Sequence, residues 1–374
     1  MTAAPRRSIY FSRFKPTWDL GGGSRRMMQV WETLQGLGCE LRTSAQAQGL
    51  DAGCRRRLEK GGSRLQLWRL RSWAAGRRKA VFRLREISRA WSRAAGDLAG
   101  VDLVFMDDPI YFQPLFEALE RLRIPVVAIC HNLETLVPSQ VENGSSMTLL
   151  RRELDILSRC RLVVTISREE TWLLRNLGVR CFHFPYYPRD PVLGRLQAVR
   201  GIRAAGGDKS GILMLANAKN PQSGRGMERF LAYWRKKQLA SVSGPLLVAG
   251  FHSDKVFPAR LFGADAQLLG QLENDRLDEL LAGVAGCLCY QESGGGALTR
   301  ICEMLLAGVP VLANAHAARS YHGREGLIEF AVLDELGDAL HRLRRHAGAI
   351  PPPPVPDPAP LLAAIARVLE GGPA

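Results

Sequence analysis

Negative charge is scarce in this chain. Its 374 residues include 36 acidic side chains against 51 lysines and arginines, which leaves a formal net charge of +15 at pH 7. An excess of this size points to an anionic partner. Three classes fit: nucleic acid, an anionic membrane surface and a phosphorylated substrate.

Long apolar runs are absent as well. No uninterrupted apolar stretch approaches the length that spans a bilayer, and the first residues, MTAAPRRSIYFSRF, contain no apolar signal core. We therefore expect a cytoplasmic protein that does not cross a membrane. Attachment to the inner face of the plasma membrane stays open as an alternative.

Metal-ligand and disulfide spacings are also missing. The eight cysteines are scattered, and Cys130, Cys287, Cys289 and Cys302 fall in predicted core elements, where a free thiol packs as a small apolar group. This usage suits a reducing compartment. The pair Asp107-Asp108 is the one hint of a divalent cation, and no residue near it has ligand spacing. The sequence therefore predicts no metal site.

Strands alternate with helices in both halves, and 46% of the residues are apolar, enough for two cores. This alternation predicts an α/β protein with two doubly wound, Rossmann-like parallel sheets. We expect a first domain over 1–190 and a second over 191–348. A proline-rich linker and a terminal helix follow over 349–374. Predicted strands cover 8–12, 101–106, 124–130, 162–166, 211–217, 245–250, 287–290 and 309–313.

The most informative stretch is AGCLCYQESGGGALTRICEMLLAGVPVLAN, residues 285–314. A short buried strand leads into Gly294, Gly295 and Gly296, and a helix follows that ends at Gly308. A helix that opens after glycines offers unpaired N–H groups and a positive dipole end to a phosphate. Glu303, on the side of that helix away from its apolar stripe, could accept hydrogen bonds from hydroxyl groups. The plain alternative is a crossover whose glycines only make a turn, with Glu303 in solvent.

The same string resembles the donor-site signature of the retaining, GT-B-fold glycosyltransferases of the family-four type. Their glycine loop precedes E-A-x-x-x-G-x-P-V, and Glu303, Gly308, Pro310 and Val311 match it in order and spacing. The resemblance implies that Glu303 holds the ribose of a nucleotide sugar. Commoner members carry another glutamate eight residues earlier, where this chain has Gly295, so it is closer to a glycine-triplet subgroup. Glu292 lies three residues too early to replace that acid.

Two further parts of the site follow from the resemblance. His131-Asn132, after the strand IPVVAIC, matches the family's His-Asp/Asn beside the donor sugar, with Glu134 as a further candidate. The alternative is a structural histidine. Gly22 and Gly23 match the family's glycine pair near the acceptor and the donor phosphate, in a loop before a helix that we expect to begin near Ser24. A G-x-G-x-x-G spacing is absent there, which argues against a dinucleotide site.

A basic side chain should meet the donor diphosphate. The candidates are Lys219 and Arg225, which we expect in a loop after the strand 211–217, and Arg300 at the start of the helix after the glycine loop. A guanidinium group can contact a diphosphate through two hydrogen bonds at once.

The resemblance implies a metal-independent, retaining hexosyltransferase without a cofactor. It would move a sugar from a nucleotide diphosphate sugar to a glycan or lipid-linked acceptor in surface polysaccharide or glycoconjugate synthesis. One alternative is a catalytically inactive relative that binds nucleotide sugar or a partner, which Gly295 motivates. Another is an unrelated basic protein that binds nucleic acid.

The segment 55–93 is crowded with arginine and lysine, opposed by only Glu59 and Glu86, and Trp68, Trp73 and Trp91 are interleaved. Basic helices with tryptophan suit anionic lipid headgroups. Two alternatives are that its apolar seam packs on the core and that it binds nucleic acid. No nucleic-acid module signature is present, so we expect a membrane surface as partner and no nucleic acid.

Overall fold

The computed structural model describes residues 7–12, 15–43, 98, 100–110, 113–137, 146–215, 217–218, 221–346 and 348–371. The basic segment 55–93, with its predicted membrane contact, and Lys219 lie outside these residues. The chain divides into two compact units. The first comprises Met1–Leu20, Met27–Pro185 and Asp357–Ala374, and the second comprises Gly21–Arg26 and Tyr186–Pro356.

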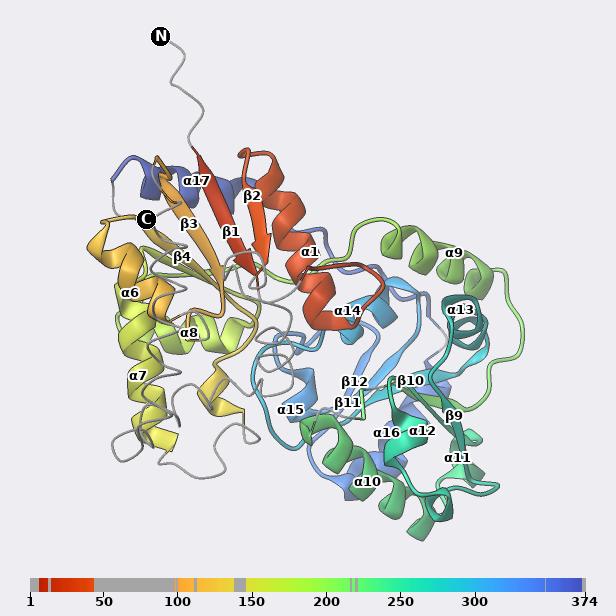
Figure 1. Cartoon of the computed structure of the whole chain (residues 1–374). Helices are drawn as coiled ribbons and strands as arrows, with labels where there is room; N and C mark the ends of the chain where they lie inside the picture. The colour runs from red at the N-terminus through yellow and green to blue at the C-terminus, as the bar shows by residue number, and fades with distance from the viewer. Residues whose placement is uncertain are drawn as a thin grey trace. The chain divides into compact units, whose positions relative to one another are not determined.

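The first unit is built on a parallel sheet with the order β2-β1-β3-β4-β5-β6 (Figure 1). Its strands are β1 (Ser8–Ser12), β2 (Glu40–Thr43), β3 (Leu103–Asp107), β4 (Val126–Cys130), β5 (Leu162–Thr165) and β6 (Cys181–His183). Its helices are α1 (Gly22–Gln35) from Met27 onward, α6 (Gln113–Arg121), η2 (Glu134–Leu136), α7 (Ser146–Arg159), α8 (Arg168–Asn176) and α17 (Ala359–Leu369).

Both faces of this sheet are covered. Val127 and Ile129 of β4 pack in one core with Ile365 of α17, whereas Ala128 packs on the other face with Phe116 of α6. Strands that are apolar on both faces are typical of parallel sheets, which explains why β3 and β4 read as unbroken apolar runs. The C-terminal helix therefore completes the core of the first unit.

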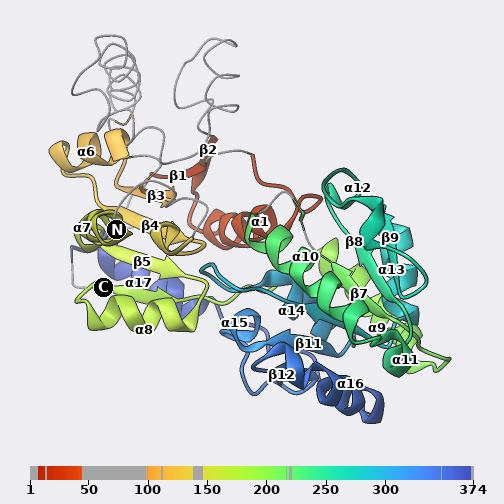
Figure 2. The same cartoon turned by 90° about the horizontal axis from the view of Figure 1, so that it is seen from below.

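The second unit has a parallel sheet with the order β12-β11-β10-β7-β8-β9 (Figure 2). Its strands are β7 (Ile212–Leu215), β8 (Leu246–Ala249), β9 (Ala266–Gly270), β10 (Gly286–Cys289), β11 (Val311–Asn314) and β12 (Leu327–Phe330). Its helices are α9 (Val192–Ala204), α10 (Pro221–Lys236), α11 (Ala240–Ser243), α12 (Ser253–Val256), η4 (Ala259–Leu261), α13 (Asn274–Gly283), α14 (Thr299–Leu306), α15 (Ala315–Ala318), η5 (Leu333–Glu335) and α16 (Leu336–Arg345).

The order of this sheet determines where a ligand site can form. The chain runs outward from β7 to β9, returns to β10 beside β7, and then runs outward to β12. In open α/β sheets, ligands bind beyond the carboxyl ends of the strands where the order reverses. The loops after β7 and β10 occupy that position in the second unit.

The prediction of two doubly wound parallel sheets is confirmed. Two local predictions were wrong. The first helix begins at Gly22 rather than near Ser24, so Gly22 and Gly23 lie in its first turn. Arg225 lies in α10 rather than in a loop, because the helix already begins at Pro221, and proline suits a first helical position. The short strands β2, β6 and β12 and the helix α9 were not predicted.

Candidate functional site

The glycine loop lies at the reversal point of the second sheet. It follows β10, which pairs with β7 on one side and β11 on the other, and it leads into α14. Gly294 and Gly296 have φ angles of 112° and 69°, which residues with a Cβ adopt at a cost. Gly295 does not have a positive φ, so its backbone would accommodate another residue. Glycine is therefore required by backbone geometry at two of the three positions.

Arg319, which sequence reasoning missed, holds this loop. Its Nε donates to the Gly296 carbonyl at 2.7 Å, and one terminal nitrogen donates to the Gly295 carbonyl at 2.6 Å and to Gln291 Oε1 at 3.2 Å. The other terminal nitrogen donates to the His316 carbonyl. Burial lowers the pKa of the His316 side chain, and the charge of Arg319 lowers it further.

The contacts of Arg319 determine which way the loop presents its amides. In a trans peptide the C=O and N–H bonds point in opposite directions. Because the carbonyls of Gly295 and Gly296 point at the guanidinium group, the N–H groups of Gly296 and Ala297 point away from it. The start of the loop is fixed by Asn314, which accepts from the Gln291 N–H at 3.0 Å and donates to the Gln291 carbonyl at 2.6 Å. The Gly295 and Gly296 carbonyls of the loop are thus fixed on Arg319, and the Ala297 N–H lies on the opposite side of its peptide from that contact.

Arg300 joins the two strand ends at the reversal point. One terminal nitrogen donates to the carbonyl of Leu215, the last residue of β7, at 2.6 Å. Its Nε is buried and has no hydrogen-bond partner among the described residues. A cation in the first turn of a helix opposes the helix dipole. The position of Arg300 on α14 is therefore suited to a bound anion.

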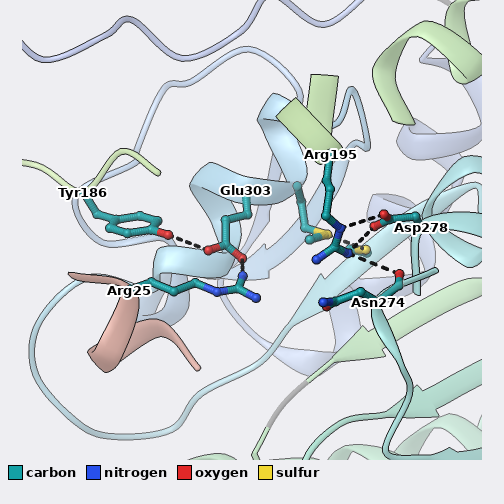
Figure 3. A network of polar contacts seen from close by, with 8 residues as sticks. Arg25, Tyr186, Arg195, Asn274, Asp278 and Glu303 are labelled. Carbon is teal, nitrogen blue, oxygen red and sulfur yellow. Dashed lines mark hydrogen bonds and ion pairs between the residues drawn. The ribbon is translucent and has the colours of Figure 1, made fainter. Parts of the chain in front are cut away.

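Glu303 is less accessible than its sequence position indicated. Glu303 is 6% exposed, because α14 is buried on nearly every side from Ile301 onward. Glu303 Oε2 accepts from Arg25 at 2.8 Å and Oε1 accepts from the Tyr186 hydroxyl at 2.6 Å (Figure 3). Burial, followed by the charge of Glu303, raises the pKa of Tyr186 far above its ordinary value, so Tyr186 remains a donor. A ribose would have to share this carboxylate with two protein donors.

The segment Gly21–Arg26 brings Gly22 against the start of α14. A Cβ on Gly22 would lie 2.0 Å from Thr299 Oγ1, whereas a Cβ on Gly23 would meet no atom within 4 Å. Gly22 therefore makes a close approach that only glycine permits, and Gly23 does not. Arg25, three residues on, reaches Glu303 from the same turn.

His131 lies in the first unit, directly after β4. Its Nε2 is 2.7 Å from Oδ1 of Asp107, the last residue of β3, although the angles fall outside those of a hydrogen bond. Asp107 is buried and Asp108 adopts a left-handed φ of 61°. Glu134, in η2, is 5% exposed. The structure thus brings His131 to Asp107, a pairing that sequence reasoning did not anticipate.

The remaining candidates are placed as follows. The side chain of Arg225 and the whole of Lys219 lie outside the described residues. Glu292 pairs with Arg229 at 3.0 Å and accepts from the Tyr290 hydroxyl at 2.9 Å, away from the position of the family's acid. Within the described residues, no cluster of three or more His, Cys, Asp or Glu side chains could hold a metal ion. The described helices include none that is long and apolar enough to cross a membrane.

Comparison with known proteins identifies the architecture. Residues 21–181 match the family of the glycosyl transferase 4-like domain. Sucrose-phosphate synthase from Thermosynechococcus elongatus superimposes with a TM-score of 0.59 at 16% identity, over 91% of this chain and 90% of that one. Trehalose 6-phosphate synthase from Burkholderia multivorans gives 0.59 at 13% identity, over 92% and 91%.

The Anabaena protein HepE, solved with UDP and glucose, gives a TM-score of 0.56 at 14% identity, over 91% of this chain and 90% of that one. No match to a curated protein was found. Identities of this size establish the fold and leave the substrate to the site. The chain accordingly has the fold of the GT-B glycosyltransferases, and its residues 21–181 match the glycosyl transferase 4-like domain.

Proposed function

We propose that the protein transfers a sugar from a nucleotide diphosphate sugar to a glycan or lipid-linked acceptor, with retention and without a metal ion. The acceptor would belong to surface polysaccharide or glycoconjugate synthesis. The observation that carries the proposal is the preorganised glycine loop at the reversal point of the second sheet. The Ala297 N–H, the N-terminus of α14 and Arg300 together suit a diphosphate.

The reaction needs its charge stabilised where the diphosphate departs. Arg300 supplies a guanidinium group fixed through Leu215, and the Ala297 amide supplies a dipole that need not reorganise. Glu303 would accept the ribose hydroxyls beside Arg25, and His131 would bind the transferred sugar. Lys219 and Arg225 remain proposed as additional diphosphate ligands.

The donor can be identified by thermal shift with UDP-, GDP- and ADP-sugars, since a ligand of the folded state raises the apparent stability. UDP-glucose is the first compound to test, because it is bound in a HepE structure. Arg300→Met should abolish the shift, whereas Arg276→Met, which removes an exposed ion pair on α13, should preserve it. An unchanged shift in Arg300→Met would remove the diphosphate from this loop.

Metal independence is tested separately. The proposed site has basic side chains and N–H groups where a cation would otherwise neutralise the diphosphate. We expect turnover to continue unchanged in EDTA. Loss of activity with the chelator, restored by magnesium or manganese, would direct attention to Asp107 and Asp108.

A catalytically inactive nucleotide-sugar binder is the second candidate. Gly295, at the position of the acid in commoner family members, favours it. Donor hydrolysis in the absence of acceptor separates the two, because a binder gives a thermal shift without releasing nucleoside diphosphate.

A further inference from the structure

We propose that Glu153 positions the loop that carries His131 and, through its own protonation, makes sugar transfer depend on pH. The pH dependence of sugar transfer rests on the proposed function, because that function gives His131 its role in binding the sugar. Glu153 acts here as a positioning residue and contacts no substrate.

The loop after His131 is held by two buried carboxylates. The N–H groups of three consecutive residues point at them. Leu133 N donates to Glu170 Oε1 at 3.0 Å, and Glu134 N donates to Glu153 Oε1 at 2.8 Å. Thr135 donates twice to Glu153 Oε2, from its N–H at 3.0 Å and from its hydroxyl at 2.5 Å.

These contacts restrain His131 from its C-terminal side. On the N-terminal side, Cys130 is paired with Thr165 in the sheet. Only His131 and Asn132 separate that pairing from the first anchored amide. Glu153 comes from α7 and Glu170 from α8, and both residues are buried. Release of Glu153 would free the N–H groups of Glu134 and Thr135 in η2 and leave Leu133, with its contact to Glu170, as the one remaining anchor among these three amides.

Opposing effects set the protonation of Glu153. The pKa of Glu153 is raised to about 7. Burial is the largest cause, the hydrogen bonds from Thr135 and Glu134 oppose it, and the charge of Asp108 adds to it. Other titratable groups lie on the elements packed around Glu153: Asp107 at the end of β3, Cys130 at the end of β4, His131 directly after it, Glu134 in η2 and Glu170 on α8. Burial keeps the pKa of Cys130 well above its ordinary value, so this thiol stays neutral.

The direction of the effect follows from the donors. Above pH 7 the carboxylate accepts from all three donors. Below pH 7 one oxygen carries a proton, and of the three donors only the Thr135 hydroxyl can turn and accept it. Between pH 8 and pH 6 the ionised form of a group with a pKa of about 7 falls about tenfold. The loop should loosen over this interval.

The stability of the fold has the opposite pH dependence. The pKa of Glu153 is higher in the folded chain than the ordinary 4.5. Its contribution to the free energy of unfolding is therefore fully present at low pH and is lost as the pH rises through 7. An activity that falls towards pH 6 consequently cannot come from unfolding through this group.

Amide hydrogen exchange on the full chain tests the positioning without substrate. In the wild type, we expect the protection of Glu134 and Thr135, corrected for intrinsic rates, to fall about tenfold from pH 8 to pH 6. The amides of β4 should keep the same protection from exchange at both pH values. Glu153→Gln resembles the protonated acid and should give the low protection at every pH. Asp155→Asn, an exposed change on the same helix, should behave as the wild type.

Thr135→Val is the second variant, in case Glu153→Gln fails to fold. It removes one donor to the carboxylate and should move the midpoint of the exchange transition upward by about one pH unit. With the donor found by thermal shift, kcat/KM of the wild type should fall over the same interval, and Glu153→Gln should lack this dependence. Equal protection at pH 6 and pH 8 in the wild type, or an unmoved midpoint in Thr135→Val, would overturn the proposal. If exchange behaves as expected and no donor is turned over, the proposed function fails instead.

Discussion

Two arginines in the second unit, the half-buried Arg319 and the buried Arg203, bind backbone carbonyls rather than acids. Arg319 holds the glycine loop in this way. Arg203 on α9 likewise donates to the carbonyls of Gly308 at 2.9 Å, Leu281 at 2.7 Å and Val284 at 2.8 Å. Burial lowers the pKa of Arg203 from its ordinary value, yet a guanidinium group stays charged in proteins. The rigid, planar guanidinium group can donate to several carbonyls that point in different directions, whereas the ammonium group of a lysine cannot.

Arg319→Lys should therefore damage the loop while keeping the charge. An ammonium group cannot reach the Gly295, Gly296 and His316 carbonyls together, so at least two hydrogen bonds are lost. At about 1 kcal/mol for each bond, UDP affinity should weaken about tenfold to thirtyfold. Calorimetric titration with UDP measures it. Arg342→Lys, which alters one exposed contact to the Glu329 carbonyl, is the control. Equal affinities in the two variants would show that the loop keeps its shape without the guanidinium group.

Glu303→Gln tests the predicted ribose ligand. The amide accepts more weakly than the carboxylate, so we expect nucleotide-sugar binding to weaken by about 1–3 kcal/mol. Tyr186→Phe removes one donor but keeps the carboxylate and its ion pair with Arg25, and it should cost less affinity. Unchanged binding in a folded Glu303→Gln protein would leave Glu303 with a structural role, as an anchor for Arg25 and Tyr186.

At the scale of elements, α14 is fixed at both ends. Gly22 lies against Thr299 at its start, and Arg300 connects it to β7. At its end, Arg200 of α9 donates to the Leu306 carbonyl at 2.7 Å and to the Leu305 carbonyl. Carbonyls in the last turn of a helix lack intrahelical partners. The Leu305 carbonyl also accepts from the Gly308 N–H at 3.1 Å, and Arg200 supplies a donor to the Leu306 carbonyl.

The contact between α1 and α14 can be tested by paired glycine substitutions. Gly22→Ala would place a methyl group 2.0 Å from Thr299 Oγ1 and should destabilise the fold by about 1–3 kcal/mol through overpacking. Gly23→Ala lies in the same helical turn with open space around it, and it should be neutral or stabilise by up to about 1 kcal/mol. Urea unfolding compares them. Adding Thr299→Ala to Gly22→Ala should recover part of the loss, and failure to recover would place the strain elsewhere.

At the scale of the whole molecule, chain order and structural units do not coincide. Gly21–Arg26 belongs to the second unit, although it lies near the N-terminus, and Asp357–Ala374 belongs to the first. Each of these two segments contributes to the unit that it joins. Leu361 and Ile365 of the C-terminal segment pack in a core of the first unit. We retain 1–190, 191–348 and 349–374 as the proposed functional domains.

At the scale of the whole molecule, the net charge of +15 predicts binding to anionic membranes. We expect anionic vesicles to bind the protein through the segment 55–93, and neutral vesicles not to bind it. Each engaged basic residue contributes roughly 1 kcal/mol, and salt should weaken the attraction. Changing Arg77, Arg78 and Lys79 together to glutamate should release the protein in a sedimentation assay without altering the UDP thermal shift. Equal sedimentation of both proteins would show that this segment is a solvated face.

The sequence by itself determined the alternation of strands and helices, the two sheets and the position of the glycine loop. These features depend on local spacing: apolar runs for buried strands, a 3.6-residue period for α14, and glycine where Gly294 and Gly296 need a positive φ. The strands β2, β6 and β12 escaped prediction because they lie at the edges of the sheets and are only partly buried. They therefore lack the continuous apolar run of a strand that is buried on both faces.

Only the tertiary structure decided which side chains meet at the site. Arg25 and Glu303 are 278 positions apart, and Arg319 contacts a loop more than twenty positions before it. No spacing rule connects such residues, because they are brought together by strand order and helix packing. Burial likewise could not be predicted from the sequence. Glu303 is buried against Arg25 and Tyr186, and burial raises the pKa of Glu153 to about 7. An isolated glutamate has the same local pattern in solvent as in a core, and its environment alone determines its charge.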